Sequence, residues 1–193
     1  GRPIECVRVI ERNGSHEFWI GTIDGLFIYN DQKKSITTLR NNPEDNTTIA
    51  DNSVRSVFID PAGTYWVGTF YGGVNSYSPA SRQFGEVTLI NKKNQKAYKV
   101  AGAMVTDKND NLWIGTDGNG LYFLNAKGET LRQYKHDAND PLSLSHNKVK
   151  SLLLEDDGLW IGTINGLNFL NFSTGKIKHY FNEPGNAKSI SDD

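Results

Sequence analysis

Four tryptophans at a constant spacing are the feature that most constrains this chain. Trp19, Trp66, Trp113 and Trp160 each lie 47 residues after the one before. Each opens the same phrase, Trp-Ile/Val-Gly-Thr, and a glycine follows within a few residues. A fixed internal period of roughly 20–50 residues is the signature of repeat architectures. Four such units occupy nearly all of the 193 residues, so the chain is a repeat array with no room for a second domain.

The residue pattern of each unit is typical of four short strands joined by turns. In the second unit the expected strands are 54–59, 65–69, 74–77 and 83–89. In the fourth unit they are 149–154, 159–163, 167–171 and 176–181. Four strands in a repeat of this length indicate an all-β chain, a β-propeller built from four four-stranded blades. The expected blades are approximately 1–46, 47–94, 95–142 and 143–193.

Packing between blades explains the repeated Trp and Gly. A four-stranded blade cannot bury both faces alone, and a large aromatic ring is a natural contact with the next blade. We therefore expect all four tryptophans to be core residues, with the glycine after each allowing close backbone approach. The chain starts just before one first strand and stops just before another. This predicts an excerpt of a larger propeller that self-associates through open blade faces, although closure, an open arc and pairing with a second chain all remain open.

Composition narrows the classes of function. The 21 basic and 22 acidic side chains give a formal net charge of −1, so no global field attracts nucleic acid or an anionic membrane. Cys6 is the single cysteine, which excludes an internal disulfide and a cysteine-based zinc cluster. No apolar run approaches the roughly 18 residues that a membrane helix needs. We expect no direct contact of this segment with nucleic acid or membrane.

Motif searches predict no catalytic residues, no metal site and no cofactor. The four histidines form neither an HxxxH nor an HxH pair. The Gly118-Asn119-Gly120 segment lies in a strand turn without a following helix, so it is not a dinucleotide fingerprint. Adjacent carboxylates such as Asp156 and Asp157 occur in turns and do not indicate general acid–base catalysis. The segment is expected to be non-enzymatic.

Two phrases carry a resemblance to a known repeat family. Residues 160–171 follow the pattern W-I-G-T-x-x-G-L-x-x-x-N, and residues 143–149 follow S-L-S-x-N-x-V. With these phrases the chain resembles, over all four units, the two-component regulator propeller repeats of bacterial hybrid two-component regulators. The resemblance implies a periplasmic sensor segment whose parent chain continues into a β-sandwich, a membrane helix, a histidine kinase, a receiver and a DNA-binding domain. It also implies oligosaccharide sensing, with those other domains as partners.

The loops between the second and third strands supply the candidate ligand-binding residues. In propellers these loops and the blade-to-blade connections surround the central channel. An aromatic face stacks on a sugar ring, and short polar side chains bind hydroxyl groups. The candidates are Asp24, Phe70, Tyr71, Asp117, Asn119 and Asn165. Turns favour Asp and Asn for conformational reasons as well, which is the competing interpretation.

Three basic residues occupy one position in the repeat. Arg8, Arg55 and Lys150 each follow a valine at the start of the first strand of their unit. One interpretation is that they edge the channel and contact an anionic sugar. The other is that they pair with a carboxylate of a neighbouring blade.

Two other functions remain open. The rim loops of a protein-interaction scaffold would hold a partner polypeptide. A propeller lyase or glycosidase would need acid, base and metal groups gathered at one rim. A shift of melting temperature with a glycan favours a sensor over a scaffold, whereas turnover of a glycan favours an enzyme.

Overall fold

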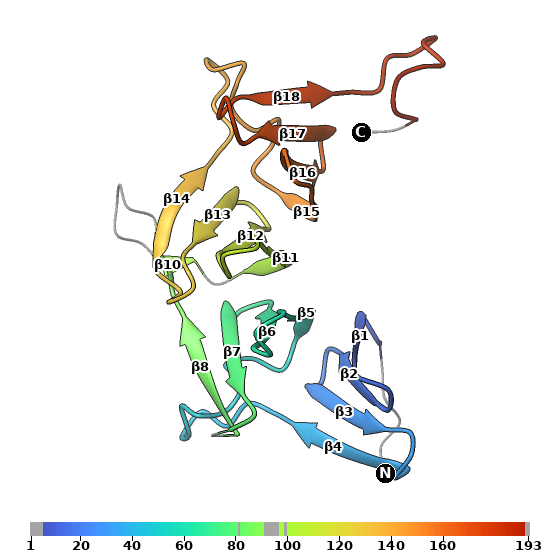
Figure 1. Ribbon diagram of the computed structural model, residues 1–193, viewed down its shortest axis with the longest axis vertical. Helices are drawn as coiled ribbons and strands as arrows, with labels where there is room; N and C mark the ends of the chain where they lie inside the picture. The colour runs from blue at the N-terminus through green and yellow to red at the C-terminus, as the bar shows by residue number, and fades with distance from the viewer. Residues whose placement is uncertain (1–5, 81, 91–96, 99, 192–193) are drawn as a thin grey trace. The chain divides into compact units, whose positions relative to one another are not determined.

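The computed structural model describes residues 6–80, 82–90, 97–98 and 100–191. All regular elements in these ranges are β-strands, and none of the described residues forms a helix that could span a bilayer. The chain divides into two compact units, residues 1–101 and 102–193. Each contains two four-stranded antiparallel blades (Figure 1). The all-β architecture of four blades is therefore confirmed, and the two units are described separately below.

The first unit holds two blades in which strand order follows chain order. The first blade consists of β1 (Val9–Asn13), β2 (Glu17–Gly21), β3 (Leu26–Asn30) and β4 (Ser35–Leu39). The second consists of β5 (Val54–Ile59), β6 (Tyr65–Thr69), β7 (Val74–Ser78) and β8 (Gln83–Val87). A short pair, β9 (Leu89–Ile90) and β10 (Ala97–Tyr98), follows them. The unusual basic connection at 91–99 lies mostly outside the described residues.

The second unit repeats the same plan. Its first blade consists of β11 (Ala101–Thr106), β12 (Leu112–Thr116), β13 (Leu121–Leu124) and β14 (Thr130–Tyr134). Its second blade consists of β15 (Val149–Leu154), β16 (Gly158–Thr163), β17 (Leu167–Asn171) and β18 (Ile177–Tyr180). The strands expected in the second and fourth units occur within two residues of their expected ends. The blade limits given above stay predictions.

Aromatic stacking joins the two blades of the first unit. Trp19 on β2 stacks on Tyr65 of β6 with the ring centroids 4.2 Å apart, and it meets Tyr77 of β7 edge-on at 5.3 Å. A Cβ added to Gly21 would lie only 2.6 Å from Cγ1 of Val54 on β5. Because a real Cβ is not tolerated so close, the glycine of the Trp-Ile-Gly-Thr phrase is what allows β2 to approach the next blade.

The blades of the second unit meet through equivalent residues. Trp113 on β12 lies parallel to Phe172, which directly follows β17, with a centroid separation of 5.7 Å. A Cβ on Gly115 would lie 2.5 Å from Cγ1 of Val149, the first residue of β15. The role proposed from sequence for the Trp and the Gly is confirmed at both of these blade contacts.

The fourth tryptophan departs from this pattern. Trp19, Trp66 and Trp113 are 2%, 6% and 4% exposed, as expected of core residues, but Trp160 is only partly buried. Its ring contacts within the described chain are with Phe169 and Tyr180 of its own blade. The expectation that all four tryptophans are core residues is wrong for Trp160, which is only partly buried.

Candidate ligand-binding turns

A buried threonine builds each turn between the second and third strands. The Thr22 hydroxyl donates to the carbonyl of Gly25 at 3.0 Å and accepts from the amide of Asp24 at 2.9 Å. The same hydroxyl-to-carbonyl bond recurs at the other turns, from Thr69, Thr116 and Thr163. Since each hydroxyl closes its own turn, the residues just after it are presented on a fixed backbone.

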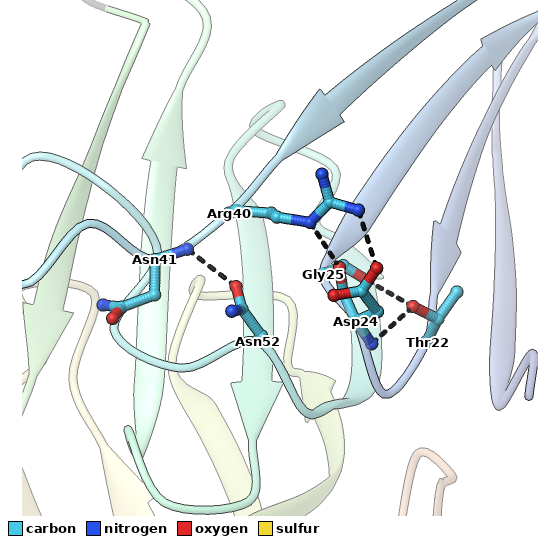
Figure 2. Close-up of polar contacts among 6 residues, drawn as sticks. All are labelled: Thr22, Asp24, Gly25, Arg40, Asn41 and Asn52. Carbon is cyan, nitrogen blue, oxygen red and sulfur yellow. Dashed lines mark hydrogen bonds and ion pairs between the residues drawn. The ribbon is translucent and has the colours of Figure 1, made fainter. Parts of the chain in front are cut away.

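Asp24 is held by an arginine from the end of the same blade (Figure 2). Arg40, one residue beyond β4, donates from Nη2 to the Asp24 carboxylate at 2.7 Å and from Nε to its carbonyl at 3.0 Å. The Asp24 side chain is 50% exposed, so a ligand would have to share a carboxylate that Arg40 already engages. The adjacent connection is fixed as well, because the Asn41 amide donates to Asn52 Oδ1 (Figure 2).

Phe70 and Tyr71 form an aromatic pair on the equivalent turn of the second blade. Their rings meet edge-to-face with centroids 4.4 Å apart. The Arg55 guanidinium lies over the Phe70 ring, with its Cζ 4.2 Å from the ring centroid. Phe70 is half-buried, whereas Tyr71 is 68% exposed. The turn therefore displays one free aromatic face, backed by a ring and a cation.

A β-bulge sets the position of Arg55. In the β5–β6 ladder Val54 pairs with Thr69 and Ser56 pairs with Gly68, so Arg55 is the extra residue between them. Bulges often redirect a side chain beside a functional site. Lys150 occupies the same kind of bulge, between the paired residues Val149 and Ser151 of β15.

Arg8 lies beside this cluster, just before β1. Its amide donates to the carbonyl of Gly21 at 2.9 Å, which places it at the end of the β1–β2 ladder. Its Nη1 donates to Oγ of Ser53 at 3.1 Å, two residues before Arg55. Strands β1 and β5 contact each other, so both arginines lie on the same end of neighbouring first strands.

The candidates of the second unit are bound more tightly to their surroundings. Asp117 accepts from Lys150 Nζ at 3.2 Å across the two blades, and its side chain is 24% exposed. Asn119 hydrogen bonds to the Tyr122 hydroxyl, and its carbonyl accepts from Gln133 Nε2. The amide of Asn165 donates to Thr163 Oγ1 at 3.1 Å. The Lys150–Asp117 ion pair confirms, for Lys150, the interpretation that the basic residue pairs with a carboxylate of a neighbouring blade. For Arg55 the described residues provide no such carboxylate, and that interpretation stays a prediction.

Two residues that hold the turns were not expected from sequence. Arg40 and Gln133 lie at the ends of the fourth strands and bind turn residues of the same blade. Antiparallel pairing of Leu26 with Leu39 places residue 40 next to the turn. A basic or amide side chain just after, or near the end of, the fourth strand was therefore the available signal.

The described residues contain no group of three or more His, Cys, Asp or Glu side chains that could hold a metal. Asp24, Phe70 and Tyr71 belong to the first unit, and Asp117, Asn119 and Asn165 belong to the second. Each set is a separate group of turn residues, and the assignment of either to a ligand stays a prediction.

Comparison with known proteins tests the family resemblance. The family model described as "Two component regulator propeller" matches residues 48–71 and 96–118, which contain the first-strand and Trp-containing segments of two successive units. These two stretches match the two-component regulator propeller repeat. The resemblance noted from the Trp-Ile-Gly-Thr phrase is thereby confirmed.

Similar proteins agree with this assignment. Histidine kinase P4 of Formosa agariphila is 29% identical over 139 residues, which is 72% of this chain and 10% of the kinase. The extracellular domain of a hybrid two-component system from B. thetaiotaomicron has a TM-score of 0.79 at 24% identity, covering 97% of this chain and 24% of that one. The chain thus spans a small part of the proteins it matches.

The fold alone does not separate sensors from enzymes. An ancestral GH74 enzyme has a TM-score of 0.66 at 12% identity, covering 95% of this chain and 25% of that enzyme. Blades of this kind therefore support more than one activity, and function has to be argued from the side chains at the turns.

Proposed function

We propose that this chain is part of the extracytoplasmic ligand-sensing domain of a hybrid two-component regulator. The observation that carries the proposal is the family match on two repeats, together with a histidine kinase as a relative along 72% of the chain. The extracellular domain of a hybrid two-component system supports the same location through its fold. In the whole protein, binding of a ligand changes the packing between domains and signals to a cytoplasmic histidine kinase.

The ligand that fits the turns best is an oligosaccharide. Tyr71 offers an exposed aromatic face of the kind that stacks on sugar rings. Asp24 supplies a short polar group in the same unit, and Asn119 and Asn165 supply others in the second unit, each on a turn that a threonine hydroxyl holds fixed. Within each unit, turn residues held rigid in this way bind a sugar without ordering a loop first, which lowers the entropic cost of binding.

Fractionation of native cells tests this function directly. An antibody to this segment is used to locate and size the natural chain that contains it. We expect a membrane-bound chain several times heavier than the 21.5 kDa segment. A soluble chain too short for kinase and receiver domains would overturn the sensor proposal and favour a free-standing scaffold or enzyme.

We also propose that the segment itself is non-enzymatic. The GH74 likeness makes this worth testing, because that neighbour is an enzyme with a related fold. Incubation of the purified chain with a glycan panel, followed by chromatography of the products, is expected to show intact glycans. Release of shorter products in proportion to protein concentration would favour the lyase or glycosidase alternative.

Self-association is a further part of the proposal. Ile10 on β1 and Leu153 on β15 are large apolar side chains that are 59% and 60% exposed. Exposed apolar residues on strands favour contact with a second copy of the chain. Sedimentation equilibrium is expected to show a concentration-dependent dimer, which Leu153→Lys weakens. A monomer at all concentrations would contradict the proposal.

A further inference from the structure

The position that Arg55 occupies is used differently in the two units. In the second unit the bulge residue Lys150 reaches Asp117, the residue just after Thr116, on the preceding blade. In the first unit the residue just after Thr22 is Ile23, which takes the place of Asp117. The blade that precedes Arg55 therefore supplies isoleucine where an acid neutralises Lys150.

Among the described residues, Arg55 consequently has no acidic partner for its charge. Its Nε is buried and makes no hydrogen bond with any described residue. Among the described residues no carboxylate lies within ion-pair distance of its guanidinium or of Arg8, and Arg8 is held by the neutral Ser53 hydroxyl. Arg8, just before β1, and Arg55, on β5, have no described acid paired with them, so this end of the first unit carries a local positive charge that the net charge of the chain does not reveal.

The contacts around Arg55 also fix its direction. The guanidinium stacks on the Phe70 ring, which limits its rotation, and because its Nε is buried the two Nη groups are the ones left for hydrogen bonding to a ligand. Tyr71 stands edge-on to Phe70 and is mostly exposed. A planar guanidinium matches the two oxygens of a carboxylate, and the neighbouring aromatic suits a sugar ring.

From this geometry we infer that Arg8, Arg55, Phe70 and Tyr71 form a binding site for an acidic oligosaccharide that carries a carboxylate on its ring. Arg55 receives the carboxylate, Arg8 adds a second positive charge and Tyr71 stacks on the sugar. The inference rests on the proposed function and names the ligand class. The four residues all belong to the first unit, so this site does not depend on the arrangement of the two units.

Titration calorimetry with trigalacturonate, and with cellotriose as the neutral comparison, tests the inference. The 193-residue chain is expected to bind trigalacturonate at least tenfold more tightly than cellotriose. Arg55→Lys keeps the charge but removes the planar fork. It is expected to lower the affinity about tenfold or more, because hydrogen bonds to charged groups have about this effect. Higher salt weakens the same binding.

Two further variants separate recognition from folding. Ile23→Asp introduces the acid that the second unit has, and it is expected to pair with Arg55 and reduce trigalacturonate affinity about tenfold or more. Arg132→Lys is the matched control, since Arg132 stacks on Tyr134 in the same manner but on an outer strand of the second unit. Its affinity is expected to equal that of the unchanged chain.

Each negative outcome has a distinct meaning. Equal binding of trigalacturonate and cellotriose, or binding that Arg55→Lys leaves intact, would overturn the acidic site while leaving the sensor proposal standing. Absence of binding to either sugar would also overturn the site. Cell fractionation decides the sensor proposal independently of these titrations.

Discussion

The first and second units place the same bulge residue in opposite electrostatic situations. Arg55 lies over an aromatic ring and has no acidic partner among the described residues, whereas Lys150 pairs with Asp117 at 3.2 Å. The backbone is alike, because both residues are the extra residue of a first-strand bulge. The difference comes from one position after the turn threonine, which is Ile23 in one case and Asp117 in the other. The two bulges thus share one geometry, and the residue after the turn threonine decides whether a described acid pairs with the cation.

The turn between the first and second strands of a blade also differs between the two units. In the first unit Asp60 is buried, and its Oδ2 accepts from Trp66 Nε1 at 2.8 Å. In the second unit Asp107 binds the side chain of Asn111 instead, and the buried Trp113 Nε1 has no hydrogen-bond partner in the described structure. The indole N–H groups of Trp66 and Trp113, at equivalent positions in their blades, therefore differ in hydrogen bonding.

Removing a tryptophan should give the largest difference in stability between the blades. Trp113→Ala is expected to lower the free energy of unfolding by about 3–5 kcal/mol, the usual cost of deleting a large buried aromatic. Trp160→Ala is expected to cost clearly less, because its ring is partly exposed and Trp113 has Phe172 of the next blade against it. Urea unfolding of both variants measures the difference. Equal losses would contradict the role of blade contacts.

The buried aspartate should have the next largest effect. Asp60→Ala leaves the Trp66 indole N–H without a partner, and an unsatisfied buried donor costs about 1–3 kcal/mol. Asp107→Ala is the matched variant and is expected to cost less, since Trp113 lacks that hydrogen bond already. Chemical denaturation compares them, and a larger loss for Asp107→Ala would break the contrast.

The ion pair of the second unit should contribute little to stability. A double-mutant cycle with Lys150→Met and Asp117→Asn is expected to give a coupling of about 0.2–1 kcal/mol, which falls with salt, because both side chains are partly exposed. The matching cycle with Arg55→Met and Ile23→Val is expected to show no salt-dependent coupling. A larger coupling in the first unit would contradict the unpaired state of Arg55.

The smallest expected effect is a pH dependence at Glu11. Burial raises the pKa of this carboxyl above its ordinary value of 4.5. The folded chain therefore loses stability relative to Glu11→Gln as the pH rises from 4.5 through the raised pKa. Asp156 behaves oppositely, because the hydrogen bond that it accepts from Lys108 lowers its pKa. The contribution of Asp156 to folding stability is therefore lost as the pH falls. Thermal melts of Glu11→Gln from acidic to neutral pH test the sign, and an advantage confined to low pH would contradict it.

Strand positions were largely predictable from sequence, whereas side-chain partners were not. The constant Trp spacing and the Pro and Gly turns fixed the first strands of the second and fourth blades, which match residues 54–59 and 149–154 as expected. The stacking of Arg55 on Phe70 depends on a bulge that shifts the register by one residue, and no local pattern in the sequence signals such a shift. Arg40 was missed because its contact with Asp24 spans a whole hairpin.

The most direct test of the central claim observes the Arg55 side chain itself. In a chain labelled with ¹⁵N-arginine, the Nε–Hε signals of individual arginines are followed by NMR while trigalacturonate is added. The account predicts that the signals of Arg55 and Arg8 move, that the signal of Arg132 does not, and that cellotriose moves none of them. An unmoved Arg55 signal at saturating trigalacturonate would contradict the claim that the first unit keeps this cation for an acidic sugar.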